Sequence, residues 1–334
     1  MNSLGKLAKM AFVFGLLTAP GIAHAGSPIP VTECQQILDV SGGDYVLTED
    51  VGPSGCGDIG GPITIAANGI HLNTAGVTVN AIRDGIHIND SVSKIVIDGG
   101  GSFIGGGGIS IGKAHGVVVE GLTLQGESDL GGSMAGVAIN GASGVTLIRC
   151  AINGFDTVGM KMTGARAISV TNSNVFGDLG IVGSVNDGRF ENNNVVTGAI
   201  IGEGIVLTGS RNLVANNSLN QLNPGIALGS DDVGIQLDRG NRAIGNIINN
   251  FFSGLKLSGN SNVVARNVIN GSRYAFQQSM YGIEMMSGAE HNLIEKNLVA
   301  GNLNDLYEGN PSPCVNVWRK NTFGTSGGAT ACIH

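Results

Sequence analysis

Side chains that could carry acid–base chemistry gather between residues 229 and 284. Hydrolysis of a glycosidic bond uses two carboxyl groups, one that protonates the leaving oxygen and one that activates water or attacks the sugar. A lyase instead combines carboxylates that bind calcium with a base that removes a proton. The segment offers both kinds of group, and we take as candidate catalytic residues Asp231, Asp232, Asp238, Arg239, Lys256 and Glu284.

Three neighbouring residues are candidate substrate contacts, namely Gln236, Tyr274 and Tyr281. In a lyase the three aspartates would hold calcium and Arg239 or Lys256 would act as the base, and the sequence indicates no other cofactor. The run Gly229-Ser230-Asp231-Asp232 is also typical of a solvated turn, because glycine, serine and aspartate are common there. The residues therefore leave open whether the chain is an enzyme.

A repeated phrase of glycine, an aliphatic residue, a variable residue and a second aliphatic residue must position these groups. It recurs about ten times, from Gly69-Ile70-His71-Leu72 and Gly85-Ile86-His87-Ile88 to Gly282-Ile283-Glu284-Met285. The mean period of about 24 residues is that of a solenoid. Because strand side chains alternate, the two aliphatic residues point inward and the residue between them faces solvent.

Three repeats are longer than the others, and their extra residues come just before the Gly-Ile strand. These insertions, roughly 126–135, 220–233 and 271–281, should stand along one edge of a single face. We predict a groove between the last two loops, with a floor formed by Gln236, Asp238, Arg239, Lys256 and Glu284. His71 and His87, which occupy the same place in successive phrases, are interpreted as solvent-facing residues rather than a metal pair, because no third ligand follows.

A second strand in each repeat begins next to a small polar residue. Asparagine occupies this place in five repeats, at positions Asn193, Asn217, Asn246, Asn267 and Asn297. Stacked asparagines can hydrogen-bond to one another and to the turn backbone. Cys150 and Ser173 occupy the same register, so we expect Cys150 to be a buried member of this ladder rather than a reactive thiol.

The coils resemble the right-handed parallel β-helix repeats of pectate-lyase-like folds and of a periplasmic repeat family associated with copper binding. The segment from Cys34 through Tyr45-Val46-Leu47-Thr48 to Cys56 resembles the end caps of secreted bacterial β-helix-repeat proteins, as does the tail that contains Trp318 and Asn321-Thr322-Phe323-Gly324. The resemblance implies an all-β, single-stranded right-handed parallel β-helix of about ten coils with disulfide-bearing caps. It does not imply one activity, because such proteins include lyases, hydrolases, epimerases and binding proteins.

The chain divides into four predicted segments. Residues 1–25 combine two lysines, an apolar run and the ending Ala23-His24-Ala25, which is typical of a secretory signal peptide. We then expect an N-terminal cap at 26–62, the β-helix at 63–305 and a C-terminal cap at 306–334. A secreted or periplasmic location suits two local disulfides, for which the simple pairing is Cys34 with Cys56 and Cys314 with Cys332.

The net charge of the chain limits the classes of binding partner that we expect. Removal of Lys6 and Lys9 with the signal peptide lowers the 18 basic residues to 16 against 25 acidic residues, a formal charge of −9. This balance disfavours nucleic acid, anionic lipid and, without calcium, a polyanionic glycan, and no membrane span is expected after cleavage. The leading hypothesis is an exported protein that binds, and as a lyase or glycoside hydrolase would cleave, an extracellular polysaccharide. The alternative is a non-catalytic scaffold, and the sequence does not indicate an oligomeric state.

Overall fold

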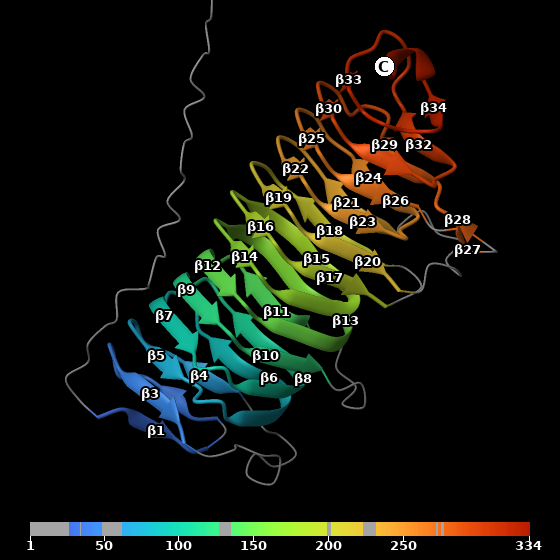
Figure 1. Ribbon diagram of the computed structural model, residues 1–334. Helices are drawn as coiled ribbons and strands as arrows, with labels where there is room; N and C mark the ends of the chain where they lie inside the picture. Colours follow the sequence, from blue (N-terminus) through green and yellow to red (C-terminus); the bar gives the residue numbers. More distant parts are fainter. Residues whose placement is uncertain are drawn as a thin grey trace, which may run out of the picture.

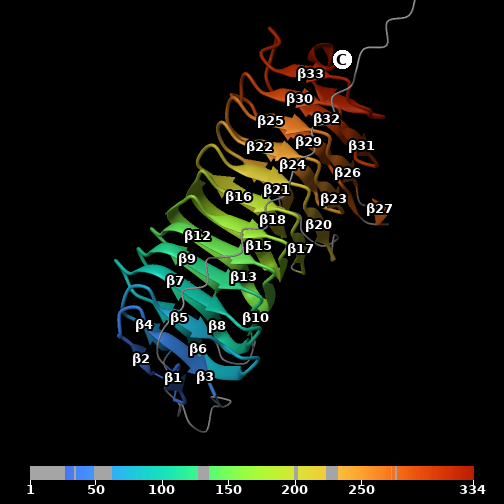
Figure 2. The ribbon, with the colours of Figure 1, turned by 60° about the vertical axis from the view of Figure 1, so that its left-hand side comes forward.

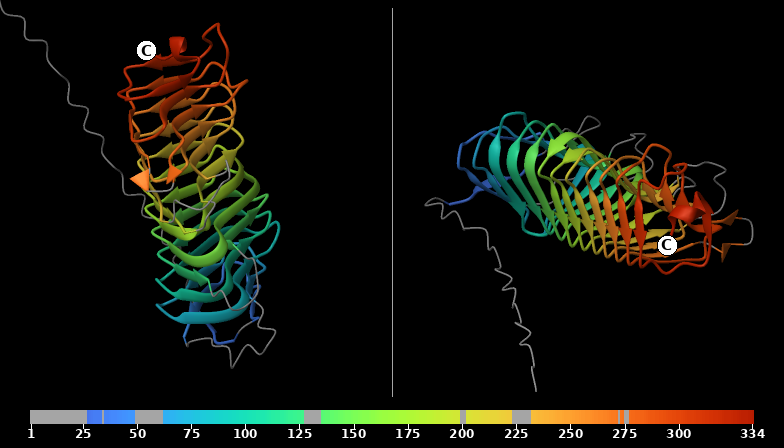
Figure 3. Two further views of the ribbon diagram at one scale, coloured as in Figure 1. Left: turned by 90° about the vertical axis from the view of Figure 1, so that its right-hand side faces the viewer. Right: turned by 90° about the horizontal axis from the view of Figure 1, so that it is seen from above.

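The computed structural model describes residues 27–33, 35–48, 62–126, 135–198, 202–222, 232–271, 273–274 and 277–334. They form an all-β, right-handed parallel β-solenoid of about 11 turns, close to the ten predicted (Figure 1). The turns succeed one another along one axis, with the N-terminal strands at one end and the C-terminal strands at the other (Figures 2 and 3). The predicted fold class is therefore confirmed.

Each turn contributes strands to three parallel stacks, which we call A, C and B in chain order. Stack A contains β1 (Ile29–Val31), β3 (Asp44–Leu47), β5 (His71–Asn73), β7 (Ser93–Asp98), β9 (His115–Glu120), β12 (Ser143–Ile148), β14 (Ser169–Thr171), β16 (Arg189–Glu191), β19 (Leu213–Ala215), β22 (Arg242–Ile244), β25 (Val263–Ala265), β30 (Leu293–Glu295) and β33 (Val317–Arg319).

Stacks B and C share four long strands that bend from one stack into the other, namely β6 (Thr78–Ile88), β8 (Ser102–Ile111), β13 (Ala151–Arg166) and β15 (Asn174–Asn186). Stack C also contains β10 (Thr123–Gly126), β17 (Asn194–Thr197), β20 (Ser218–Gln221), β23 (Ile247–Asn249), β26 (Val268–Asn270) and β31 (Leu298–Ala300). Stack B also contains β2 (Ile37–Leu38), β4 (Ile63–Ile65), β11 (Ala135–Asn140), β18 (Glu203–Thr208), β21 (Val233–Leu237), β24 (Ser253–Leu257), β29 (Tyr281–Met285), β32 (Asn304–Glu308) and β34 (Ser326–Gly328).

The core is a column of aliphatic side chains inside these stacks. In stack B, Ile235 pairs with Leu255, which pairs with Ile283, and all three are fully buried. Inward residues of stack A repeat the pattern, with Phe190 stacked on Val214. Successive turns lie about 4.8 Å apart, so each buried side chain contacts its counterparts above and below.

Sharp bends flank the short strands of stack A. A residue with positive φ precedes the strand and another follows it, as in the pairs Asp187 and Asn192 or Arg211 and Asn216, with φ between 54° and 60°. This left-handed conformation favours glycine and asparagine, and it recurs in successive turns. The abundance of these two residue types in the sequence is thus partly explained by the two bends.

The predicted asparagine ladder lies in the bend between stacks A and C. The Nδ2 of each buried asparagine donates to the Oδ1 of the next at 2.9–3.0 Å, from Asn193 to Asn321. Ser173 extends the ladder by its backbone N–H, which donates to Asn193, and the N–H of Cys150 donates to Ser173 Oγ. Cys150 is 1% exposed, and the prediction that it is a structural rung is confirmed.

A second ladder, which the sequence analysis did not anticipate, occupies the bend from stack B to stack A. The backbone N–H of each member donates to the Oδ1 of the next at 2.8–2.9 Å, and the members are Asn212, Asn241, Asn262, Asn292 and Asn316. Each of them precedes a member of the first ladder by five residues, as in Asn241 and Asn246. The two ladders thus fix both ends of stack A.

The phrase at Gly69 belongs to a different stack from the later ones. His71 lies in β5 and pairs with Val96 in stack A, whereas His87 lies in stack B and pairs with Ser110. The two histidines occupy the same place in successive phrases and yet lie in different stacks, because the alternation of buried and exposed residues is the same in all three stacks. His71 instead lies between two carboxylates, with Nδ1 2.7 Å from Asp44 and Nε2 3.1 Å from Asp98.

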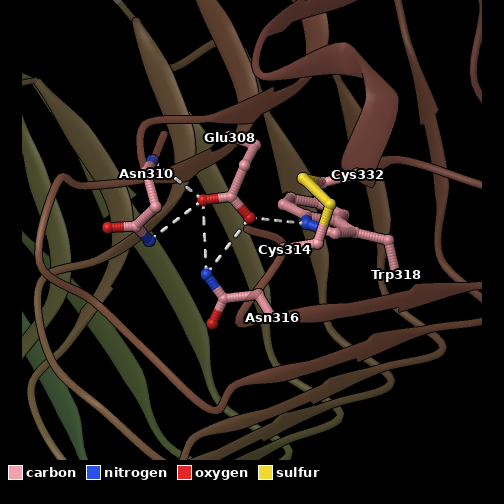
Figure 4. The surroundings of a disulfide bond; sticks show 6 residues. All are labelled: Glu308, Asn310, Cys314, Asn316, Trp318 and Cys332. Carbon is pink, nitrogen blue, oxygen red and sulfur yellow. Dashed lines mark hydrogen bonds between the residues drawn. A yellow bond between two sulfur atoms is a disulfide. The ribbon is translucent and has the colours of Figure 1, made fainter. Parts of the chain in front are cut away.

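A buried carboxylate covers the C-terminal end of the core. Glu308, at 1% exposure, occupies the inward position that pairs with Met285 in the preceding turn. Its Oε2 accepts a hydrogen bond of 2.9 Å from Trp318 Nε1, and its Oε1 accepts bonds from the backbone and side chain of Asn310 (Figure 4). Trp318 is an inward residue of β33, the last strand of stack A, where it pairs with Ile294 of the preceding turn and is 3% exposed.

The predicted disulfide between Cys314 and Cys332 is present, with Cys332 in the short 3-10 helix η3 (Thr330–Cys332) (Figure 4). The second predicted pair, Cys34 and Cys56, lies outside the described residues, as does the segment 1–25. The other segment boundaries remain predictions. Within the described ranges, no helix is long and apolar enough to cross a membrane.

Candidate functional site

The outward side chains of stack B form a ladder of polar residues on four consecutive turns. Gln236 pairs with Lys256, Lys256 with Glu284, and Glu284 with Tyr307. All four are half-buried. The first three are residues that the sequence analysis assigned to the floor of the groove, and Tyr307 is an addition.

Aromatic rings flank Glu284. Tyr281 lies with its ring centroid 4.8 Å from that of Tyr307 and meets Phe252 edge to face at 6.5 Å. Ser253 Oγ donates a hydrogen bond of 2.9 Å to Glu284 Oε2. Burial, and then the neighbouring Glu284 and Tyr307, raise the pKa of the Tyr281 hydroxyl. We call these residues, with Lys256, the Glu284 patch.

Asp232 is a buried acid at the edge of the same stack. It immediately precedes β21, and its side chain is 4% exposed. Its Oδ2 accepts a hydrogen bond of 3.3 Å from the Phe252 N–H, while its Oδ1 has no partner among the described residues. Burial raises the pKa of this carboxyl group to about 7, against the smaller opposing effect of backbone hydrogen bonds from Phe252 and Gly202. Near neutral pH, Asp232 can therefore both hold and release a proton.

Asp238 and Arg239 lie at the opposite end of β21. Asp238 follows Asp232 by six positions along an extended strand, which places their backbones about 20 Å apart. The residues predicted to form one groove therefore lie at two separate sites: Gln236, Lys256 and Glu284 on the outward face of stack B, and Asp238 and Arg239 at the end of β21. Asp238 and Arg239 line a hollow of about 370 Å³ at the bend from stack B to stack A, together with Asn186, Gly209, Ser210, Gly259 and Asn260. We call this the bend hollow.

The remaining predicted residues cannot be placed. Asp231 and the side chain of Tyr274 lie outside the described part of the chain; the backbone of Tyr274 belongs to the antiparallel pair β27 (Arg273–Tyr274) and β28 (Gln277–Gln278). The loop predicted at roughly 126–135 is likewise mostly undescribed. No group of three or more His, Cys, Asp or Glu residues suited to a metal ion occurs among the described residues, and calcium binding stays a prediction.

Two parts of this surface escaped the sequence analysis. Tyr307 was missed because Asp305 replaces the glycine that introduces the phrase in earlier turns, so the strand did not match the repeat. Ser253 and Phe252 were missed because they precede the glycine of their phrase. Their register would have revealed them, since Ser253 pairs with both Val233 and Tyr281.

Comparison with known proteins supports the architecture. A scan against family models and a search of curated proteins find no match. Among solved structures, DFA-IIIase from Arthrobacter chlorophenolicus A6 in complex with GF2 is similar, with a TM-score of 0.62 and 14% identity over 86% of this chain and 85% of that one. Its complex with DFA-III gives a TM-score of 0.61 and 14% identity over 81% and 74%. The Dettilon tailspike protein has a TM-score of 0.49 and 14% identity over 86% and 61%. At these identities the likeness shows the fold alone.

Proposed function

We propose that this protein binds a glycan along the outward face of stack B, across β21, β24, β29 and β32. The carrying observation is the Glu284 patch, where aromatic rings, a carboxylate and an ammonium group share neighbouring turns. Aromatic rings stack on the apolar faces of sugars, and charged side chains form strong hydrogen bonds with hydroxyl groups. A linear glycan can contact several such turns at once.

Two further observations support this proposal. DFA-IIIase, which has a similar fold, has been solved in complex with DFA-III and in complex with GF2. The formal charge of the chain is −7, and Lys256 and Glu284 offset one another within the patch. A neutral glycan avoids the electrostatic repulsion that a polyuronate would meet.

Glycosidic bond hydrolysis is a second candidate function, and Asp232 favours it. A general acid works best when its pKa lies near the working pH, and burial brings the pKa of Asp232 to about 7. In this proposal Asp232 protonates the leaving oxygen, and Glu284, two turns further along the stack, is the second carboxylate. Ser253 holds the Glu284 side chain in place.

Binding to a panel of neutral and acidic polysaccharides, measured by affinity electrophoresis and calorimetry, tests the first proposal. We expect Lys256→Ala and Tyr307→Ala each to weaken binding about tenfold or more, which corresponds to about 1.4 kcal/mol. Lys161→Ala is the matched control, because Lys161 occupies the same outward position of stack B several turns away. No binding across the panel, or equal losses in all three variants, would refute the proposal and favour the scaffold alternative.

Release of reducing ends from the glycans that bind tests the second proposal. Asp232→Asn should lower the rate of cleavage by at least about 100-fold while the affinity for the glycan is retained. Binding without cleavage by the wild-type protein rejects hydrolysis and leaves the binding proposal intact.

We further propose that the protein is exported. The features of residues 1–25 support this, as does the disulfide between Cys314 and Cys332, a type of bond that persists in oxidising compartments. Mass spectrometry of the protein from the producing cells should give a mature N-terminus at Gly26. An intact N-terminus and a reduced Cys314 in the cytosolic fraction would contradict export.

A further inference from the structure

The bend hollow is a polar cavity outside the Glu284 patch. It spans four consecutive turns at the ends of β15, β18, β21 and β24. At about 4.8 Å per turn, the distance from the first turn to the last is about 14 Å. Its volume of about 370 Å³ falls within the range of small-molecule sites. The hollow is thus large enough for one or two sugar residues.

Two glycines in the lining of the hollow pack too closely against neighbouring atoms to carry a side chain. A Cβ atom on Gly259 would lie 2.6 Å from Asp238 Oδ1, and one on Gly209 would lie 2.2 Å from the backbone oxygen of Val185. The asparagine side chains are fixed by the bends themselves, since Asn186 Oδ1 accepts from Ser210 N–H at 2.9 Å and Asn260 Oδ1 accepts from Glu290 N–H at 2.7 Å. The walls of the hollow are therefore ordered without a ligand.

The hollow contains both hydrogen-bond donors and a hydrogen-bond acceptor that have no partner among the described residues. The amide nitrogens of Asn186 and Asn260 and the guanidinium of Arg239 are donors, and the carboxylate of Asp238 is an acceptor. No hydrogen bond or ion pair to these side-chain groups is found within the described part of the chain. The nearby Asp187 is already paired with Arg211, at 2.6 and 2.9 Å, and adds no free charge.

These groups select a class of ligand. Asp238 and Arg239 are adjacent in sequence and line one cavity. A simple anion attracted by Arg239 is therefore repelled by the Asp238 carboxylate, and a simple cation attracted by Asp238 is repelled by the guanidinium. A neutral molecule with several hydroxyl groups satisfies all of them, since each hydroxyl both donates and accepts. The carboxylate accepts from two hydroxyls, while the guanidinium and the amides donate to others.

We propose that the bend hollow is a second saccharide subsite, which binds a neutral mono- or disaccharide unit through Asp238, Arg239, Asn186 and Asn260. The choice of a sugar among polyhydroxyl ligands rests on the proposed glycan function. The subsite lies at the far end of the strands that carry the patch, so a glycan bound at the patch reaches it by crossing stack B. The subsite would thereby allow the protein to bind a branch or an end of the glycan chain in addition to the part held at the Glu284 patch.

Neutral mono- and disaccharides provide the test, by saturation-transfer NMR and calorimetry on the full-length protein. We expect the wild-type protein to bind at least one neutral disaccharide, and Asp238→Asn and Arg239→Ala each to weaken it about tenfold or more. Arg242→Ala is the matched control, because Arg242 is exposed on β22, outside the hollow. Tyr307→Ala should leave this affinity unchanged, since it alters only the patch.

The outcomes separate the two proposals. Loss of disaccharide binding in the Asp238 and Arg239 variants, with Tyr307→Ala unaffected, supports the subsite even if the patch binds no polysaccharide. Loss only in the patch variants overturns the subsite and supports the patch. Failure of all neutral sugars to bind, or tighter binding of a uronic acid or inorganic sulfate than of any neutral sugar by the wild-type protein, overturns it as well. A crystal soaked with the disaccharide should show it between Asp238 and Asn260.

Discussion

The buried Asp232 makes the stability of the protein depend on pH in a specific direction. Its carboxyl pKa is about 7 in the folded chain, against 3.8 for an exposed aspartate. Between these values the folded chain holds a proton that the unfolded chain has released, so the free energy of unfolding falls as the pH rises from about 4 to about 7. Above pH 7 the charged group stays buried without a full set of partners.

The size of the effect follows from the pKa difference. About 3 units at 1.36 kcal/mol per unit correspond to roughly 4 kcal/mol of stability lost between pH 4 and pH 8. Asp232→Asn keeps the shape of the side chain and removes its ionisation. We therefore expect the variant to gain stability relative to the wild-type protein as the pH rises, by up to roughly 4 kcal/mol at pH 8 compared with pH 4.

Urea unfolding at half-unit steps from pH 4 to pH 9 measures this difference. Asp238→Asn is the matched control, since it removes one carboxylate at the opposite end of the same strand. The reasoning would be refuted if the stability of Asp232→Asn followed that of the wild-type protein in parallel across the whole range. A difference that grows toward acidic pH would also refute it, because that sign belongs to a carboxylate with a lowered pKa.

Three other expectations can be checked on the same protein. Asn246→Ala removes four hydrogen bonds and leaves buried groups of the ladder unpaired, so it should cost about 3 kcal/mol or more in thermal or urea unfolding, whereas the exposed Asn270→Ala should cost less than about 1 kcal/mol. Glu284→Gln should lower the pKa of Tyr281, because it removes a negative charge that opposes the phenolate; an ultraviolet titration that shows no change would contradict the geometry of the patch. Burial raises the pKa of the Cys150 thiol, so a thiol reagent should modify it at least about 100-fold more slowly in the native protein than in urea, and equal rates would show that the ladder opens there.

The fold could be predicted from the sequence because each turn repeats the same short pattern of buried and exposed residues. Alternation around residues such as Ile235 and Leu237 defines the buried face of one strand, and the return of the same pattern in the next turn defines its neighbour. The ladder from Asn193 onward was predictable for the same reason. The second ladder carries an equally regular signal, an asparagine five positions before each member of the first ladder from Asn217 to Asn321.

The site was harder to predict because it depends on which end of a strand a residue occupies. Asp232 and Asp238 are close in sequence, yet an extended strand carries them to opposite edges of stack B. Burial of Asp232 depends on the neighbouring turns, and no pattern in the sequence encodes the missing partner of its Oδ1. The pairing of Glu284 with Tyr307 also required the register of the last turns.

The double asparagine ladder has a consequence for how such a chain can change. Because the two members are five positions apart in every turn that carries both ladders, a single inserted or deleted residue in that stretch would put one side chain out of step with both adjacent turns. The connection from stack C to stack B has no fixed length. Three residues join β23 to β24, and many more join β20 to β21. One edge of the molecule thus tolerates no change of length while the other accepts it. Engineered peptides grafted between β20 and β21 should leave folding intact, and new specificities could arise there.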